Sequence, residues 1–171
     1  MGLFILEIIQ LKKLSSLNNP IEDSIMPMLY ENQVYQSAAT DGLLITSSVF
    51  LSEMHSREVF QPVLVLRYSG LSCKGCVQSC LNALRRHCPG FEANPRVLIV
   101  ASETTSFRGV SDCLILPEGN RLGYDLEDTY IPHFFVYLPD CQSIIHTFIP
   151  DQSDANALNI YLASILGRYG I

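Results

Sequence analysis

The chain has 171 residues, 48% of them hydrophobic and 16% charged, so it can bury a core without needing disulfide staples. Its net charge of −6 and pI near 5.1 argue against nucleic-acid binding, which needs a basic face. Of its 6 cysteines, only Cys73 and Cys76 have a spacing that is informative by itself.

The first residues do not have the pattern of a standard targeting signal. Residues 2–9 are apolar apart from Glu7, and Lys12 and Lys13 follow the apolar run instead of preceding it. A membrane span would need about 20 apolar residues. We interpret residues 1–28 as an N-terminal segment and linker. It is either a remnant of an export signal or anchor, or a start upstream of the true Met, with a packed amphipathic helix as the alternative.

The folded domain is expected to cover residues 29–171. Within residues 43–52, two short apolar runs on either side of Ser47 predict a β-hairpin, and residues 51–54 predict a short helical turn. Residues 63–68 are β-branched and apolar, which is typical of a buried strand. Ser69 and Gly70 end that strand.

A helix that carries three cysteines is expected to follow. Ser72 can cap it, and Cys73, Cys76 and Cys80 lie along it before Cys88-Pro89-Gly90 ends it. A cysteine at a helix N-terminus is favoured as the thiolate, because unpaired N–H groups and the peptide dipoles stabilise the negative charge. Cys76 lies one turn further on, within reach of a short disulfide. The pattern predicts a redox pair.

The remaining elements alternate and then end in a hairpin and a helix. The strands are expected at residues 96–101, 113–116, 133–138 and 143–149, with helices at residues 105–110 and after residues 150–154. Ile131-Pro132 comes directly before the third of these strands. The order predicts an α/β fold in which helices flank a mixed sheet.

This order of elements resembles the thioredoxin fold, because C-x-x-C at a helix start follows a strand and Ile131-Pro132 precedes an antiparallel hairpin. The lead-in before residue 63 resembles the TlpA/ResA branch of bacterial cell-envelope thiol-disulfide oxidoreductases. The resemblance covers about residues 43–169. It implies a thioredoxin-like fold, a central mixed sheet flanked by helices, with an N-terminal β-hairpin extension.

The resemblance also implies roles for individual residues. Cys73 would be the attacking thiolate, Cys76 the resolving thiol and Pro132 a cis-proline facing them. Ile131 would offer its backbone to an extended stretch of a client protein. Lys74, next to Cys73, favours the thiolate, and Gly75 lets another chain approach closely.

The expected activity is therefore thiol-disulfide exchange on protein substrates, in a direction that the sequence leaves open. No cofactor is expected. The partners would be a protein thiol or disulfide client and an upstream redox donor or acceptor protein, and not nucleic acid. By resemblance, the location is the periplasm or cell envelope, with a membrane tether upstream of the folded domain, although the sequence has no clean signal peptide.

Two departures from the family pattern affect proton transfer to and from Cys76. The buried acid of thioredoxins is replaced by Arg67, and the acid that ResA-type proteins carry on the active-site helix is replaced by Ser79. One alternative is therefore a binding module that keeps the fold without turning over. Another is a Sco-like copper chaperone that uses Cys73, Cys76 and His133, since thiolates and imidazole suit copper.

The other cysteines have simpler interpretations. Cys80 is expected to be a small buried hydrophobe and not a third redox thiol. Cys88, Cys113 and Cys141 are interpreted as core or edge residues. Zinc binding would require a second cysteine pair, or a Cys/His pair, at matching spacing, and the sequence shows neither.

Overall fold

The computed structural model describes residues 40–102, 113–151 and 154–171. The expected domain boundary at residue 28 and the expected helix at residues 105–110 lie outside these ranges. The strands are β1 (Val63–Ser69), β2 (Val97–Ser102), β3 (Cys113–Leu116), β4 (His133–Leu138) and β5 (Ser143–Phe148). The helices are α3 (Ser48–Ser56), α4 (Lys74–His87) and α5 (Ala155–Tyr169), with 3₁₀ turns η1 (Phe91–Ala93) and η2 (Asp125–Thr129).

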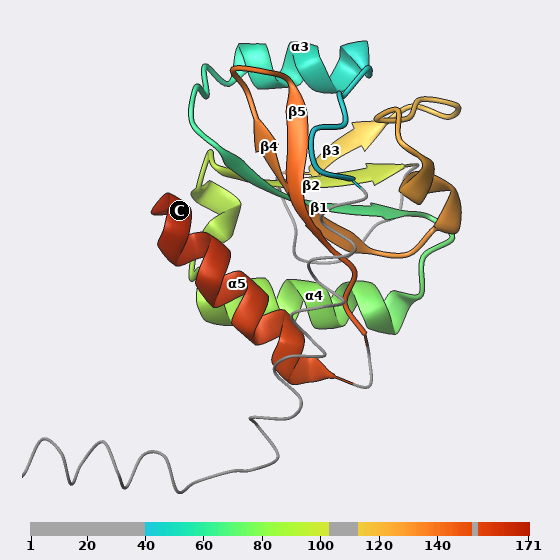
Figure 1. The fold of residues 1–171 in the computed structure, drawn as a ribbon. Helices are drawn as coiled ribbons and strands as arrows, with labels where there is room; N and C mark the ends of the chain where they lie inside the picture. The colour runs from blue at the N-terminus through green and yellow to red at the C-terminus, as the bar shows by residue number, and fades with distance from the viewer. Residues whose placement is uncertain (1–39, 103–112, 152–153) are drawn as a thin grey trace, which may run out of the picture. The chain divides into compact units, whose positions relative to one another are not determined.

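The strands form one mixed, five-stranded sheet in the order β3-β2-β1-β4-β5 (Figure 1). β1 pairs in parallel with β2, and β2 in parallel with β3. β4 runs antiparallel to both β1 and β5. β1, β2 and β4 are buried on both faces, which is why their sequences are nearly continuous apolar runs and do not alternate.

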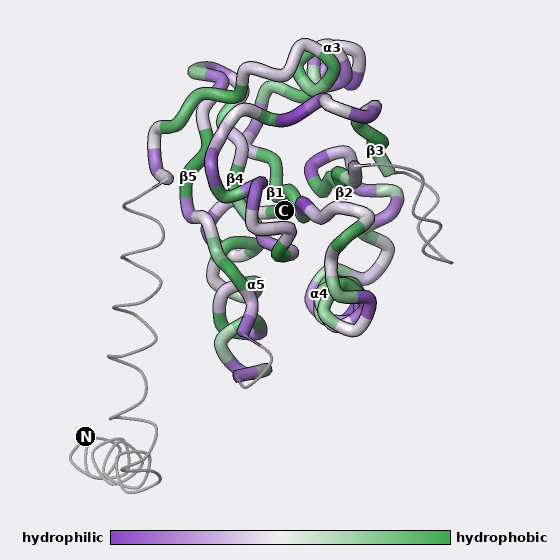
Figure 2. The backbone as a smooth tube through the Cα atoms, turned by 90° about the vertical axis from the view of Figure 1, so that its right-hand side faces the viewer, coloured by the Kyte–Doolittle hydropathy of each residue, from purple (hydrophilic) through white to green (hydrophobic). Residues whose placement is uncertain are grey.

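Helices cover both faces of the sheet, as Figures 1 and 2 show from two directions. On one face, Leu64 and Leu66 of β1 belong to a core that includes residues of α4 and α5. On the other face, Val63 and Val65 belong to a second core, to which α3 contributes Phe50. The prediction of an α/β fold with a mixed sheet flanked by helices is confirmed.

The prediction of an N-terminal β-hairpin is wrong, because the second half of that segment forms α3. The Ser47 hydroxyl accepts a hydrogen bond from the Phe50 N–H at 3.3 Å and caps the helix. Phe50 and Met54, four residues apart, are the buried residues of its inner face. A short apolar run fits strand and helix equally well until its neighbours decide which face is buried.

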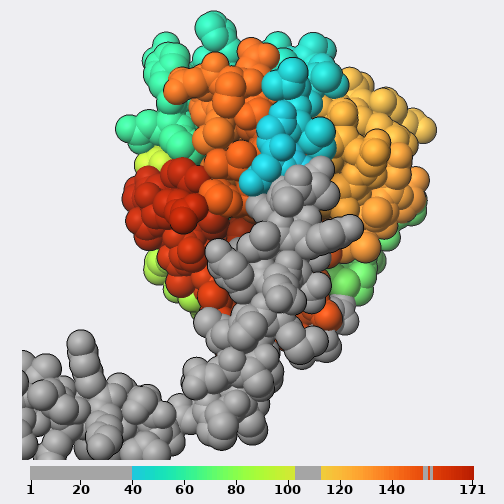
Figure 3. Space-filling model, viewed as in Figure 1, coloured from blue at the N-terminus to red at the C-terminus, as the bar shows by residue number. Residues whose placement is uncertain are grey.

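The first half of the same segment lies along β5, the strand next to it in Figure 3. The Gly42 N–H donates to the Ile144 carbonyl at 2.9 Å, and the Ile144 N–H donates to the Leu43 carbonyl at 2.9 Å. A single β-bridge joins Leu44 to Ser143. These residues pair with the edge of the sheet and do not form a hairpin of their own.

In the part of the chain that the structure describes, no helix combines the length and the hydrophobicity that a membrane crossing requires.

Candidate functional site

The site begins where β1 ends and α4 starts. Cys73 is the N-cap residue of α4, and its Sγ accepts a hydrogen bond from the Cys76 N–H at 3.4 Å. The expected cap, Ser72, has another role: its hydroxyl accepts from the Ser69 N–H at 2.9 Å and donates to the Tyr130 carbonyl at 2.6 Å. The helix therefore begins one residue later than predicted, and the Cys73 sulfur itself takes the place of the capping oxygen.

Exposure falls steadily along the cysteines of α4. Cys73 is exposed, Cys76 is half-buried and Cys80 is only 1% exposed. Cys73 is thus the more exposed of the pair. Burial, together with the negative charge of a Cys76 thiolate, raises the pKa of Cys80 to about 12, so this thiol stays protonated near neutral pH. Cys80 belongs to the core, as expected.

The remaining cysteines lie away from this helix face. Cys88 is buried at the end of α4, and Cys113 is half-buried on the edge strand β3. Cys141 is exposed in the turn between β4 and β5, which corrects the expectation of a core or edge position for this residue.

A small pocket of about 70 Å³ brings Cys76 together with Ile131 and Pro132. The other wall residues come from α4, from the end of β5 and from α5: Ser79, Cys80, Arg86, Pro150, Asp151 and Leu158. Pro132 is buried, whereas Ile131 is 42% exposed. Residues that lie far apart in the sequence thus meet on the α4 side of the sheet. Of the expected site residues, this pocket includes Cys76, Ile131 and Pro132, but not Cys73, Lys74 or Gly75.

Lys74 and Gly75 are both exposed beside Cys73. A Cβ atom added to Gly75 would lie 3.8 Å from the Cys73 sulfur, which is an ordinary contact. The absence of a side chain at Gly75 therefore leaves the approach to the Cys73 sulfur open on that side.

The expectation of a cis-proline is wrong. The Ile131–Pro132 peptide bond is trans, and the described residues contain no cis peptide bond. The trans form is favoured by about 0.5–1 kcal/mol for a bond before proline, so a cis bond needs tertiary contacts that select it. In the trans form found here, the Ile131 carbonyl accepts a hydrogen bond from His133 Nδ1 at 2.8 Å.

The backbone of Ile131 makes hydrogen bonds within the protein. Its N–H donates to Thr129 Oγ1 at 3.4 Å, and its carbonyl is occupied by His133. The side chain of Ile131 is what the site presents to solvent.

His133 is buried and neutral. The Ile131 carbonyl can only accept, so Nδ1 carries the proton and Nε2 accepts from the Tyr124 hydroxyl at 2.8 Å. Burial lowers the pKa of His133 to about 4. Both ring nitrogens are therefore used inside the protein, and among the described residues no group of three Cys, His, Asp or Glu side chains could hold a metal ion. This arrangement does not fit the copper-chaperone alternative.

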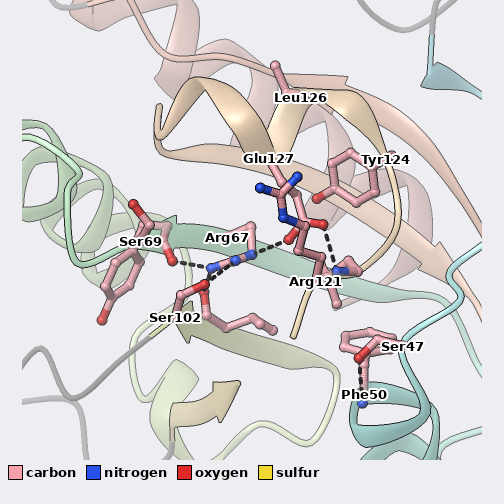
Figure 4. Close-up of polar contacts among 12 residues, drawn as sticks. Ser47, Phe50, Arg67, Ser69, Ser102, Arg121, Tyr124, Leu126 and Glu127 are labelled. Atoms are coloured by element: carbon pink, nitrogen blue, oxygen red, sulfur yellow. Dashed lines mark hydrogen bonds and ion pairs between the residues drawn. The ribbon is translucent and has the colours of Figure 1, made fainter. Parts of the chain in front are cut away.

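Arg67 forms a buried ion pair that the sequence did not reveal (Figure 4). Its Nε donates to Glu127 Oε1 at 2.9 Å, and Glu127 Oε2 accepts from the N–H groups of Leu122 and Gly123 at 2.6 and 3.0 Å. Arg67 also donates to the Tyr68 carbonyl and to the Ser102 hydroxyl. Glu127 lies in an acidic stretch, so the sequence contained no signal that distinguished it from its exposed neighbours.

Arg67 points away from Cys76. It alternates along β1 with Leu66 and Tyr68, which face the core that includes α4, so its own side chain lies on the opposite face. There it lines a second pocket of about 200 Å³, together with Ser102 and Glu127. Arg67, at the position of the thioredoxin acid, therefore lines a different pocket from Cys76.

Comparison of this chain with protein-family models, with curated proteins and with solved structures finds no match. A function for this chain is therefore inferred from the positions, distances and burial of the residues described above.

Proposed function

We propose that this protein is a thioredoxin-like thiol-disulfide oxidoreductase that exchanges disulfides with protein clients through Cys73 and Cys76. The observation that carries this proposal is the pocket that Cys76 shares with Ile131 and Pro132, one helical turn from the exposed Cys73. The strand order supports it, because β1 leads into the cysteine helix and lies between the parallel β2 and the antiparallel β4. The resemblance to the TlpA/ResA branch extends the proposal to the periplasm or cell envelope.

The chemistry proceeds in two displacements, written here for reduction of a client. The Cys73 thiolate attacks one sulfur of the client disulfide, forming a mixed disulfide and releasing the other client sulfur as a thiolate. Cys76 then loses its proton and attacks the Cys73 sulfur, which releases the second client thiolate and leaves a Cys73–Cys76 disulfide. Two electrons pass to the client, and an upstream dithiol protein must return them. Oxidation of a client is the same sequence in reverse.

Several features favour Cys73 as the attacking sulfur. It is exposed, and it accepts a hydrogen bond from a helix N-terminal amide, which stabilises a negative charge more than a neutral thiol. Cys76 is half-buried and lines the pocket, so it is less accessible to a client disulfide. Its role is to attack the Cys73 sulfur of the mixed disulfide, one helical turn away.

Large apolar and aromatic side chains are exposed on the two loops next to the start of α4. Leu71 is 71% exposed, Tyr130 is 47% exposed and Ile131 is 42% exposed. The hydrogen bond from Ser72 to the Tyr130 carbonyl holds the loop that carries Leu71 next to the loop that carries the other two. Exposed apolar groups gathered at one place mark a surface for protein contact, which favours a protein client over a small disulfide.

The test is insulin reduction in the presence of dithiothreitol, with variants that separate the roles of the cysteines. The wild-type protein is expected to accelerate reduction and Cys73→Ser to abolish the acceleration. Cys76→Ser, first reduced and then mixed with insulin without dithiothreitol, is expected to accumulate a mixed disulfide visible on a non-reducing gel. Cys141→Ser is the matched control, because Cys141 is also exposed but lies outside the site.

No acceleration by the wild-type protein in either the reducing or the oxidising direction would reject the catalytic proposal. The binding module would then remain, an outcome that the absence of an acid at Arg67 and Ser79 favours.

A further inference from the structure

The loop that faces Cys76 has its main chain already occupied. The Tyr130 N–H donates to the Glu127 carbonyl at 3.4 Å, and the Tyr130 carbonyl accepts from the Ser72 hydroxyl at 2.6 Å. The Ile131 N–H donates to Thr129 Oγ1 at 3.4 Å. The next residue is a proline, which has no N–H. The loop therefore offers no main-chain donor to another chain.

The Ile131 carbonyl accepts a hydrogen bond from His133. The imidazole is 1% exposed, and its proton lies on Nδ1 because the Ile131 carbonyl can only accept, so that Nε2 accepts from the Tyr124 hydroxyl at 2.8 Å. Nδ1 then donates to the carbonyl at 2.8 Å. The ring also lies against Tyr124 and Phe135, with ring centroids 5.7 and 6.3 Å away. The carbonyl is thus directed toward a rigid, buried donor.

We propose that His133 is a positioning residue that sets client specificity: by donating to the Ile131 carbonyl, it competes with a client N–H for this acceptor, so that clients are recognised more by side chains next to their cysteine than by strand-like pairing. This inference depends on the proposed function. It differs from what the resemblance implied, since it reduces the part of the Ile131 backbone in client binding.

The consequence for client chemistry is specific. When an extended peptide adds to a protein edge, main-chain hydrogen bonds supply much of the affinity and side-chain pockets supply the specificity. Here competition from His133 weakens the main-chain contribution at Ile131, so more of the affinity must come from contact with the exposed side chains of Leu71, Tyr130 and Ile131. The fitting partner is a flexible segment in which large apolar residues flank the cysteine.

The test uses peptide disulfides with two kinds of single change beside the cysteine. One series methylates one peptide nitrogen at a time, and the other truncates one apolar side chain at a time to alanine. In the wild-type protein, N-methylation is expected to change KM by less than about twofold, and truncation to raise it several-fold. A main-chain bond to the client is worth about three- to tenfold in affinity, so an increase in KM of that size on N-methylation overturns the proposal.

A matched pair of variants tests His133 itself. Asparagine places its amide N–H near the position of Nδ1, whereas glutamine reaches the position of Nε2 and leaves the Ile131 carbonyl without its donor. His133→Asn is expected to keep the insensitivity to N-methylation. His133→Gln is expected to acquire a sensitivity of about threefold or more, because the released carbonyl can then accept from a client N–H. Equal insensitivity of the two variants would show that His133 does not set specificity.

Different outcomes reject the proposed function and the present inference. If the wild-type protein does not turn over the unmodified peptide disulfide, the proposed function fails. If it turns the peptide over but N-methylation raises KM by threefold or more, only the present inference fails. Thermal unfolding of both variants checks that they are folded, and the wild-type series decides the matter even if one of them is not.

Discussion

Cys73, Cys76 and Cys80 lie three and four residues apart, so they share one face of α4 while their exposure falls from the first to the last. At the helix end, the Cys73 sulfur is exposed to solvent and accepts a hydrogen bond from an amide N–H. Cys80 lies in the core. One short segment therefore holds an exposed, a half-buried and a buried cysteine.

We expect limiting iodoacetamide to label Cys73 first, then Cys76, and Cys80 last, as mapped by mass spectrometry of the reduced protein. The thiolate is the species that reacts, and burial keeps Cys80 protonated. Cys141 serves as the internal control, because it is exposed without being a helix N-cap. Labelling of Cys141 as fast as Cys73 would show that the helix end does not activate the sulfur. Earlier labelling of Cys76 would exchange the two roles.

Glu127 is the residue whose loss should cost the most stability. Glu127→Ala removes the partner of a guanidinium whose side chain is only 5% exposed and leaves the amides of Leu122 and Gly123 unpaired. Removing one partner of such a pair costs about 3–5 kcal/mol, measurable by urea unfolding. The exposed ion pair of Arg121 with Asp128 is the matched comparison, and Asp128→Ala should cost less than about 1 kcal/mol.

The double variant Arg67→Met, Glu127→Leu should lose much less stability than Glu127→Ala alone, because it leaves no unpaired buried charge. A loss as large as the single variant's would mean that packing around the pair, and not its charge, is the main contribution.

At the scale of elements, the segment before α3 is held against the loop that carries Gly123. The Thr46 N–H donates to the Leu122 carbonyl at 2.8 Å, and a Cβ atom added to Gly123 would collide with the Thr46 side chain. Gly123 also has a φ of +110°, a conformation that residues with side chains rarely adopt. This glycine allows the two segments to approach.

Gly123→Ala should therefore destabilise the protein by about 2–4 kcal/mol, from the collision and the backbone strain together. Gly167→Ala is the matched control, because Gly167 lies exposed in α5 and a Cβ atom added there meets nothing within 4 Å. That substitution should raise stability by about 0.5–1 kcal/mol, since alanine is the better helix former. Equal effects at the two positions would contradict the close approach at Gly123.

At the scale of the whole molecule, the buried His133 makes stability depend on pH. Burial lowers its pKa from 6.5 to about 4 in the folded state, so between these values the unfolded chain binds the proton more tightly. The contribution of neutral His133 to the free energy of unfolding is fully present above pH 6.5. It falls as the pH drops toward 4, by about 1.4 kcal/mol per pH unit and about 3 kcal/mol in total.

Chemical denaturation between pH 4 and 7 measures this dependence, and His133→Asn is the control because asparagine does not titrate. In the variant, the free energy of unfolding should change less steeply with pH, because about one proton fewer is taken up on unfolding over this range. Identical slopes for the two proteins would mean that His133 is protonated in the folded state or is not buried.

Sequence patterns predicted the elements whose signals are local. The long apolar runs of β1, β2 and β4 need burial on both faces. For the cysteine helix, residues next to its two ends mark where it starts and stops. The order of these elements was enough to predict a mixed sheet flanked by helices, and the spacing of Cys73 and Cys76 was enough to predict a pair at a helix start.

Tertiary structure decided everything that depends on a distant partner. Residues 48–56 became a helix because a sheet face lay beside them, and the bond before Pro132 is trans where the resemblance suggested cis. Arg67 forms an ion pair with Glu127, 60 positions along the chain. His133 forms hydrogen bonds with the Tyr124 hydroxyl and the Ile131 carbonyl. A buried charge or imidazole is stable only where its partners are brought to it, and local sequence does not contain that information.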